Sequence, residues 1–72
     1  MEIFKEGTSI VNAVAKVKNL MSLSESRRLI GSTMVFLDDV RVSDLTQKLS
    51  INDSGKLLTV GKNSFRIMVI EG

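Results

Sequence analysis

Residues 22–31 read SLSESRRLIG, and this stretch decides most of the predicted fold. Ser22 and Glu25 have the spacing of a capping box, in which the serine hydroxyl accepts from the N3 amide and the glutamate returns to the serine amide. A helix is therefore predicted to begin at Ser22, and Gly31 is a natural C′ residue that would stop it. Because so short a helix is unstable in isolation, it must be stabilised by tertiary packing.

The two faces of this predicted helix differ in chemistry. By the helical repeat, Ser26, Leu29 and Ile30 share one face. Arg28 lies about 100° or more away from that face, and Arg27 lies at its flank. The pattern predicts a helix that packs through one side and presents two guanidinium groups on the other.

A first helix is predicted upstream, over residues 8–19. Thr8 or Ser9 can serve as its N-cap, and Gly7 marks a break from what precedes it. Residues 1–7 are predicted to be a linker or an artificially added segment, and residues 8–72 are the predicted domain. The apolar positions repeat with the period of a helix, at Ile10, Ala13, Val14, Val17 and then Leu20 or Met21.

Downstream, β-branched residues become frequent and the hydrophobic period changes to that of strands. The first hairpin turns at Asp38-Asp39, the second turns over residues 61–64, and Leu45 and Leu49 are expected to pin an irregular crossing between them. The predicted fold is α+β, with two short N-terminal helices packed on a small antiparallel sheet of about four strands. The paired segments are residues 34–37 with 40–42, and residues 56–60 with 65–70.

Composition excludes several classes of chemistry. The 72 residues are 43% hydrophobic, which suffices for one small domain with a modest core. Cysteine and histidine are absent, so thiolate and imidazole metal sites, nucleophilic cysteine and histidine base catalysis are excluded. No apolar run approaches the length of a membrane span, and a soluble, cytoplasmic protein is expected. No catalytic residue, cofactor or metal is predicted.

The charge of the chain is small but unevenly distributed. The formal net charge is +2, which is modest for a nucleic-acid-binding domain. Residues 1–31 contain five Lys and Arg against three Asp and Glu, whereas residues 32–72 contain five of each kind. The cationic surplus therefore lies with the two predicted helices.

Residues 22–30, followed by residues 35–44, resemble the RNA-binding domain named after small-subunit ribosomal protein S-four, also called the alpha-L motif. That family shows a Ser-x-Ser-Glu-Ala-Arg-Arg-Leu-Ile helix and then a Val-x-Leu-Asn-Gly-x-Lys-Val hairpin. The order of elements fits the stretch 8–70. Within the family, residues 60–65 (VGKNSF) are most similar to the ending of the C-terminal domains of bacterial-type tyrosyl-tRNA synthetases. Pseudouridine synthases and a ribosome-rescue heat-shock protein also carry this domain.

The resemblance implies a non-catalytic RNA-binding module, whose partners would be RNA, with tRNA foremost, and the catalytic domain of a parent synthetase. Two adjacent guanidinium groups on a packed helix suit bidentate contacts to phosphate. The start of that helix adds further phosphate donors, and lysines of the first helix could extend the cationic strip. The predicted RNA-binding residues are Lys16, Lys18, Ser24, Arg27, Arg28 and Arg41.

The sequence also departs from the family pattern. Leu23 replaces a usual Lys or Arg, and Asp38-Asp39 replaces the usual Asn-Gly turn, which the resemblance places close to the arginine-bearing helix. Two carboxylates there would repel phosphate. A protein-interaction module that docks through the edge of its sheet, or through Leu23 and Met34, is therefore the alternative. On spacing alone, the two arginines could equally be solvated surface charges.

Overall fold

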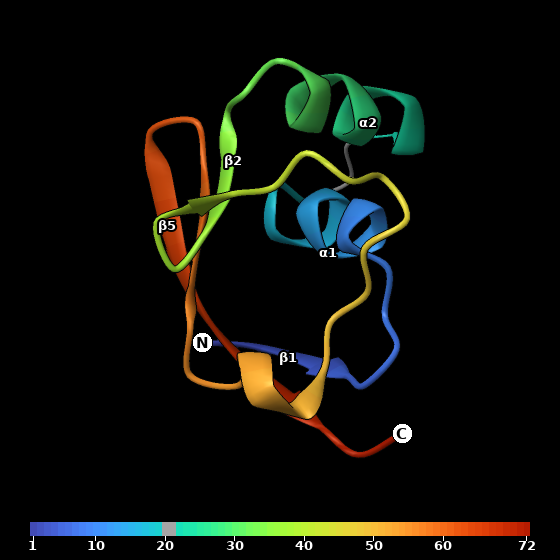
Figure 1. The fold of residues 1–72 in the computed structure, drawn as a ribbon, viewed down its shortest axis with the longest axis vertical. Coiled ribbons are helices and arrows are strands. Elements are labelled where there is room, and N and C mark those ends of the chain that lie inside the picture. Colours follow the sequence, from blue (N-terminus) through green and yellow to red (C-terminus); the bar gives the residue numbers. More distant parts are fainter. Residues whose placement is uncertain (20–21) are drawn as a thin grey trace.

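The computed structural model describes residues 1–19 and 22–72, and these form two helices packed against a five-stranded mixed sheet (Figure 1). The predicted α+β class is confirmed. The strand order is β1-β5-β4-β2-β3, with β1 parallel to β5 and the other neighbours antiparallel. The elements are β1 (Glu2–Lys5), α1 (Ile10–Val17), α2 (Leu23–Gly31), β2 (Val35–Leu37), β3 (Val40–Arg41), the 3-10 helix η1 (Ile51–Asp53), β4 (Leu57–Val60) and β5 (Asn63–Ile70).

The buried residues of both helices and of four strands form one hydrophobic cluster. In β4 and β5 the side chains alternate, so that one side of each strand enters this cluster and the other stays outside it. The helices therefore cover one face of the sheet, and the opposite face has no helix on it among the described residues. The cluster consists of Phe4, Ile10, Val11, Ala13, Val14, Val17, Ile30, Val35, Leu37, Val42, Leu49, Leu58, Val60, Ile67 and Val69.

Residues 2–5, which were predicted to belong to a linker or an artificially added segment, form strand β1 of the sheet. Glu2–Lys5 pair in parallel with the end of β5, and the Phe4 side chain is 5% exposed in the core. Four residues with charged ends carry little strand signal of their own. Their conformation depends on hydrogen bonds to a strand from the other end of the chain, which local patterns do not reveal.

Helix α1 begins directly after Ser9, which is one of its two predicted N-cap residues. The Ser9 hydroxyl accepts from the Asn12 amide at 3.1 Å. The helix ends at Val17, earlier than the predicted residue 19, because Asn19 adopts a left-handed φ of 62°. The predicted contribution of Leu20 or Met21 to this face lies outside the described residues.

Helix α2 confirms the predicted start and packing face but ends later than expected. The Ser22 hydroxyl accepts from the Glu25 amide at 3.2 Å. Ser26 and Ile30 are fully buried and Leu29 is half-buried. Gly31 is the last helical residue rather than the C′ stop, and Thr33 takes the left-handed φ of 62° instead.

Replacing Ser22 with alanine is expected to destabilise the domain by about 1 kcal/mol, because the Glu25 amide loses its capping partner. For a chain of this size the melting temperature should fall by about 4–8 °C in a thermal denaturation followed by circular dichroism. Ser24→Ala, one position into the helix, is the matched control and should have a much smaller effect. Equal shifts for the two variants would contradict a cap at Ser22.

The two hairpins form as predicted, with one difference in length. Asp38 and Asp39 both have positive φ, at 54° and 68°, as a two-residue type I′ turn requires. The second turn contains only Gly61 and Lys62 rather than four residues, because β5 starts at Asn63. Gly61, at φ 62°, allows this tighter turn.

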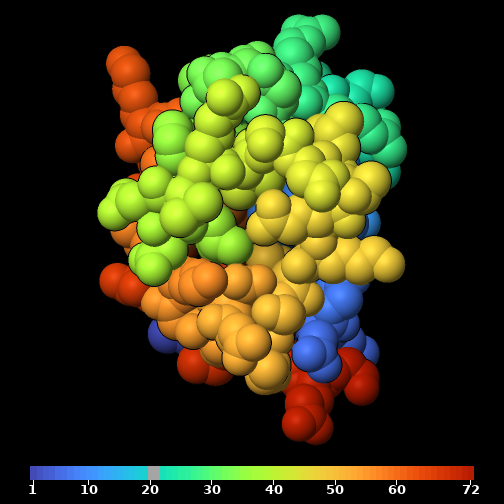
Figure 2. Space-filling model, in the orientation of Figure 1, coloured from blue at the N-terminus to red at the C-terminus, as the bar shows by residue number. Residues whose placement is uncertain are grey.

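The crossing between the hairpins is held by Leu49 but not by Leu45. Leu49 is 1% exposed, and its amide donates to the Thr8 carbonyl at 2.8 Å. Leu45 is 44% exposed, so its predicted anchoring role is wrong. The Asp44 carboxylate accepts from the Thr46 amide, and this local turn carries Leu45 outward. Figure 2 shows the crossing, in yellow, covering part of this face of the molecule.

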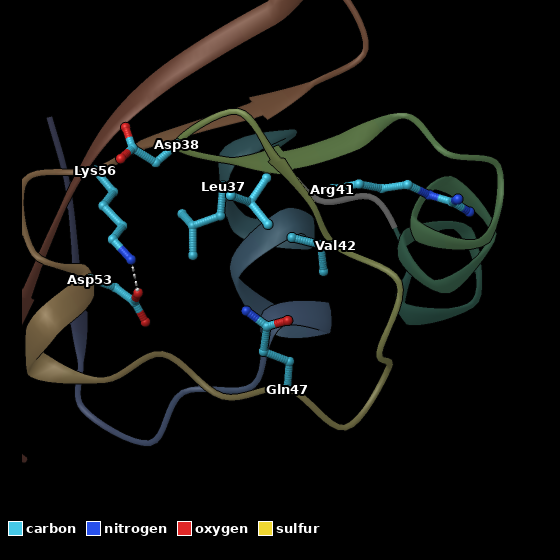
Figure 3. A pocket seen from close by; sticks show the side chains of 8 residues that line it. Leu37, Asp38, Arg41, Val42, Gln47, Asp53 and Lys56 are labelled. Carbon is cyan, nitrogen blue, oxygen red and sulfur yellow. Dashed lines mark hydrogen bonds and ion pairs between the residues drawn. The ribbon is translucent and has the colours of Figure 1, made fainter.

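The Asp53 carboxylate organises the turn that leads into β4. It accepts from the Ser50 amide at 2.9 Å and pairs with the Lys56 ammonium at 2.9 Å (Figure 3). Burial alone would raise the pKa of Asp53, but these hydrogen bonds and the Lys56 charge outweigh it and hold the pKa below its usual 3.8. The ionised form is therefore the stabilising one.

A lowered pKa for Asp53 in the folded state gives the domain a specific sensitivity to acid. The stabilisation is fully present above pH 3.8 and is lost as the pH falls through the lower folded pKa. Asp53→Asn should be less stable at neutral pH and should lose less stability than the wild type on acidification below that value. Urea denaturation across this pH range measures both, with Glu6→Gln as an exposed control. Parallel pH profiles for wild type and Asp53→Asn would contradict this role.

Candidate nucleic-acid interface

The outer side of α2 presents two guanidinium groups on a helix that is fixed in place. Arg27 and Arg28 are exposed, while Ser26 and Ile30 on the inner side are fully buried. The Ser26 hydroxyl donates to the Val11 carbonyl at 2.6 Å, which ties α2 to α1. Within residues 1–19 and 22–72, neither arginine takes part in an ion pair. Both guanidinium groups are thus available for a ligand.

Ser24 completes this exposed surface. It lies four residues before Arg28, and side chains at that spacing are neighbours on a helix. We refer to Ser24, Arg27 and Arg28 as the α2 outer surface. A hydroxyl, two guanidinium groups and the positive end of the helix dipole are all suited to phosphate oxygens.

Arg41 lies on the adjacent edge strand. It is exposed on β3, and the side chain extends toward the side on which α2 lies (Figure 3). Asp53 and Lys56 line the same shallow hollow, but the guanidinium points away from them in this view (Figure 3). Arg41 therefore adds a cation on the α2 side of the first hairpin.

Lys16 is directed away from the predicted strip. Its ammonium donates to the Ile3 carbonyl at 3.1 Å and lies 5.0 Å from the centre of the Phe4 ring. In Figure 1, α1 lies between β1 and α2, so this contact is on the far side of α1 from the arginines. Lys16 serves the packing of β1, and the structure does not bring it together with Arg27 and Arg28.

Lys18 lies about 200° from Lys16 around α1, and it has different neighbours. It lines a hollow together with Leu29 of α2 and Lys62 of the β4–β5 turn. Lys62 was not among the residues that the sequence predicted to bind RNA. Its position in a two-residue turn at the end of the last hairpin is the signal that marks it as exposed, but its proximity to Lys18 depends on the tertiary fold.

The acidic turn is not close to the arginine-bearing helix, which corrects the expectation from the resemblance. Asp38 and Asp39 follow β2 at the end away from α2. Asp38 lines a shallow hollow with Asp53 and Lys56 instead (Figure 3). Since β2 leads away from α2, its length separates these carboxylates from the α2 outer surface.

The double substitution Asp38→Asn with Asp39→Gly should stabilise the domain without changing RNA affinity. Both positions have positive φ, where Asn-Gly is the preferred pair, and the gain should be about 0.5–1 kcal/mol. Chemical denaturation measures the stability. Binding of tRNA at about 0.15 M salt measures the second effect, because exposed charges more than about 8 Å apart are largely screened there. An increase in affinity would place this turn against the RNA and contradict the position given to it here.

The described residues contain no group of three Asp or Glu side chains arranged to hold a metal ion. No described helix is both long enough and apolar enough to cross a membrane.

Comparison with known proteins identifies a relative of this chain. No protein-family model matches the chain. The chain is similar to a tyrosine–tRNA ligase of Clostridium botulinum (strain Loch Maree / Type A3), with 33% identity over 66 residues. The matched region is 88% of this chain but only 16% of the ligase, so the chain spans less than a fifth of that relative. The similarity supports a domain related to tyrosyl-tRNA synthetase.

Proposed function

We propose that this chain is a non-catalytic RNA-binding domain of the alpha-L type that binds tRNA as part of a tyrosyl-tRNA synthetase. The observation that carries the proposal is the α2 outer surface, because Arg27 and Arg28 are exposed on a helix that Ser26 and Ile30 fix in place. The similarity to a tyrosine–tRNA ligase supports tRNA as the ligand. Tyrosine activation and ATP binding would belong to another part of such a protein.

Binding in this proposal works through phosphate contacts and shape. Arg27 and Arg28 each offer a planar group that can donate two parallel hydrogen bonds to a phosphate. Ser24 can donate a further hydrogen bond from the same helix face. Contacts of this kind position a protein on RNA without reading base sequence. Discrimination among tRNAs would then come from the shape of the helical arms.

A protein-docking module is the second candidate, and one observation favours it. The sheet face opposite the helices exposes Ile3 at 51%, Met68 at 38% and Ile70 at 43% on the neighbouring strands β1 and β5. The docking surface predicted from Leu23 and Met34 is less suitable. Both are 42% exposed, but Leu23 begins α2 and Met34 follows its end, so the helix separates them.

A salt titration of tRNA binding separates the two candidates. Phosphate contacts release counterions, so the logarithm of the affinity should fall linearly with the logarithm of the salt concentration, by about 0.7–0.9 per phosphate contacted. Docking through apolar surface has no such dependence. A steep slope supports the RNA-binding proposal, and undetectable or salt-independent binding of tRNA contradicts it.

A further inference from the structure

A hollow beside the α2 outer surface has the chemistry of a nucleotide site. Its lining comes from Lys18 after α1, Leu29 of α2, Met34 before β2, Val60 of β4 and residues 61–63 at the β4–β5 turn. We call it the Lys18–Lys62 hollow. The Gly61 amide donates to the Met34 carbonyl at 2.8 Å, which joins the turn to the segment that follows α2. A Cβ on Gly61 would lie 3.4 Å from the Met34 methyl group, so Met34 lies directly against the turn.

The lining of the hollow combines apolar and cationic side chains. Leu29, Met34 and Val60 are the apolar members, and Met34 is 42% exposed. Lys18 and Lys62 are the cationic members, and Asn63 adds an amide. None of the lining residues is a carboxylate. In the part of the chain that the structure describes, neither lysine has an ion-pair partner.

These features match one kind of ligand. Apolar side chains that include a polarisable thioether favour a flat aromatic ring, and Met sulfur makes favourable contacts with such rings. Two ammonium groups and an amide in the same lining favour an anion that also carries hydrogen-bonding groups. A volume of about 340 Å³ lies near the lower limit of ligand sites, which suits a single nucleotide.

The position of the hollow agrees with this ligand. Leu29 follows Arg28 in α2, so this lining residue lies one helical step of about 100° from Arg28 of the outer surface. An RNA strand whose phosphates contact Arg28 could therefore place a neighbouring nucleotide over Leu29. Glu25 lies on the same flank one turn earlier, but it does not line the hollow.

The hollow beside β1 is less suitable, although it also contains two lysines. Lys16 is already bonded to the Ile3 carbonyl there. Acidic residues adjoin its lining in the chain, with Glu6 after Lys5 and Glu71 after Ile70. A phosphate would meet these carboxylates, whereas no lining residue of the Lys18–Lys62 hollow adjoins an acidic residue in the chain.

We propose that the Lys18–Lys62 hollow binds one unstacked base of single-stranded RNA, with Met34 and Leu29 under the base and Lys18 and Lys62 on the adjoining phosphates. This inference rests on the proposed RNA-binding function and adds a base-contacting site to it. The domain would then bind duplex backbone through the α2 outer surface and an unpaired nucleotide at its flank.

The test compares two probes that share a phosphate backbone. One is a short single-stranded oligoadenylate, and the other is an abasic oligomer of equal length. Met34→Ala should weaken oligoadenylate binding by roughly 2- to 10-fold, the effect of losing one contact between a Met sulfur and an aromatic ring, and should leave abasic binding unchanged. Lys62→Ala should weaken both probes and flatten the salt slope by about 0.7. Lys48→Ala, an exposed lysine outside the hollow, is the matched control.

The outcomes distinguish this inference from the proposed function. If Met34→Ala affects both probes equally or neither, there is no base site in the hollow, and the inference is overturned. The RNA-binding proposal then stands if Arg27→Ala with Arg28→Ala still weakens tRNA binding. If the wild type binds neither oligomer, the base site is again overturned, and if it does not bind tRNA either, the proposed function fails with it. Thermal melting of each variant verifies folding, since Met34 and Lys62 are both exposed.

Discussion

Replacing Arg27 and Arg28 together with alanine is expected to weaken tRNA binding by about 10- to 100-fold at low salt, since each lost charged contact contributes on the order of 1 kcal/mol or more. The salt slope should become shallower by about one to two units. The melting temperature should stay near that of the wild type, because both side chains are exposed. Fluorescence anisotropy with labelled tRNA at several salt concentrations measures the affinity and the slope.

A matched variant distinguishes RNA binding by the α2 outer surface from RNA attraction by the net charge of the protein. Lys5→Ala with Lys48→Ala removes the same two charges from exposed positions that are not on α2. This control should lose far less affinity. If both double variants weaken binding equally, net charge rather than the α2 outer surface holds the RNA. If the arginine variant binds like the wild type, only the protein-docking candidate is left.

The largest effect on stability is expected from Ile30→Ala. Ile30 is fully buried in the core at the C-terminal half of α2. Losing a buried aliphatic side chain of this size costs about 2–5 kcal/mol, and a chain of this length has roughly 4–11 kcal/mol in total. A substantial fraction of the variant should therefore be unfolded at 37 °C. The variant should also lose RNA affinity, because α2 is no longer anchored.

Urea denaturation of Ile30→Ala and of Leu23→Ala tests this account of the core. Leu23 lies in the same helix but is 42% exposed, so its removal should cost far less. Equal denaturation midpoints would mean that α2 is not anchored through Ile30. RNA binding of the two variants should follow their folded fractions.

Local patterns were sufficient for the parts of the fold that depend on neighbouring residues. The Ser22 cap, the packing side of α2 and the Asp38-Asp39 turn all follow from spacing and turn chemistry, and the structure confirms each of them. Strand β1 could not be predicted in this way, because its hydrogen-bonding partners are residues 67–70 at the other end of the chain. Leu45 is a different case, since a local turn at Asp44 sets its exposure, whereas the prediction relied on its hydrophobicity alone.

In the candidate site, too, some features follow from local sequence and others depend on the tertiary fold. Ser24, Arg27 and Arg28 lie on the exposed side of one short helix, as the helical repeat predicted. Lys16 does not join them, and the repeat itself places it about 200° from Lys18. The approach of Lys62 to Lys18 depends on how the last hairpin packs beside α2, and no local pattern contains that information. The role of each of these residues in RNA binding stays a prediction.

The most direct test of the central claim is to map the tRNA contact surface on the domain by nuclear magnetic resonance. Unlabelled tRNA is added to the ¹⁵N-labelled domain, and the amide signals are followed residue by residue. We expect the largest changes at residues 23–31 of α2, with smaller changes at residues 61–63. Changes centred on Met68 and Ile70 of the open sheet face, with α2 unaffected, would contradict it.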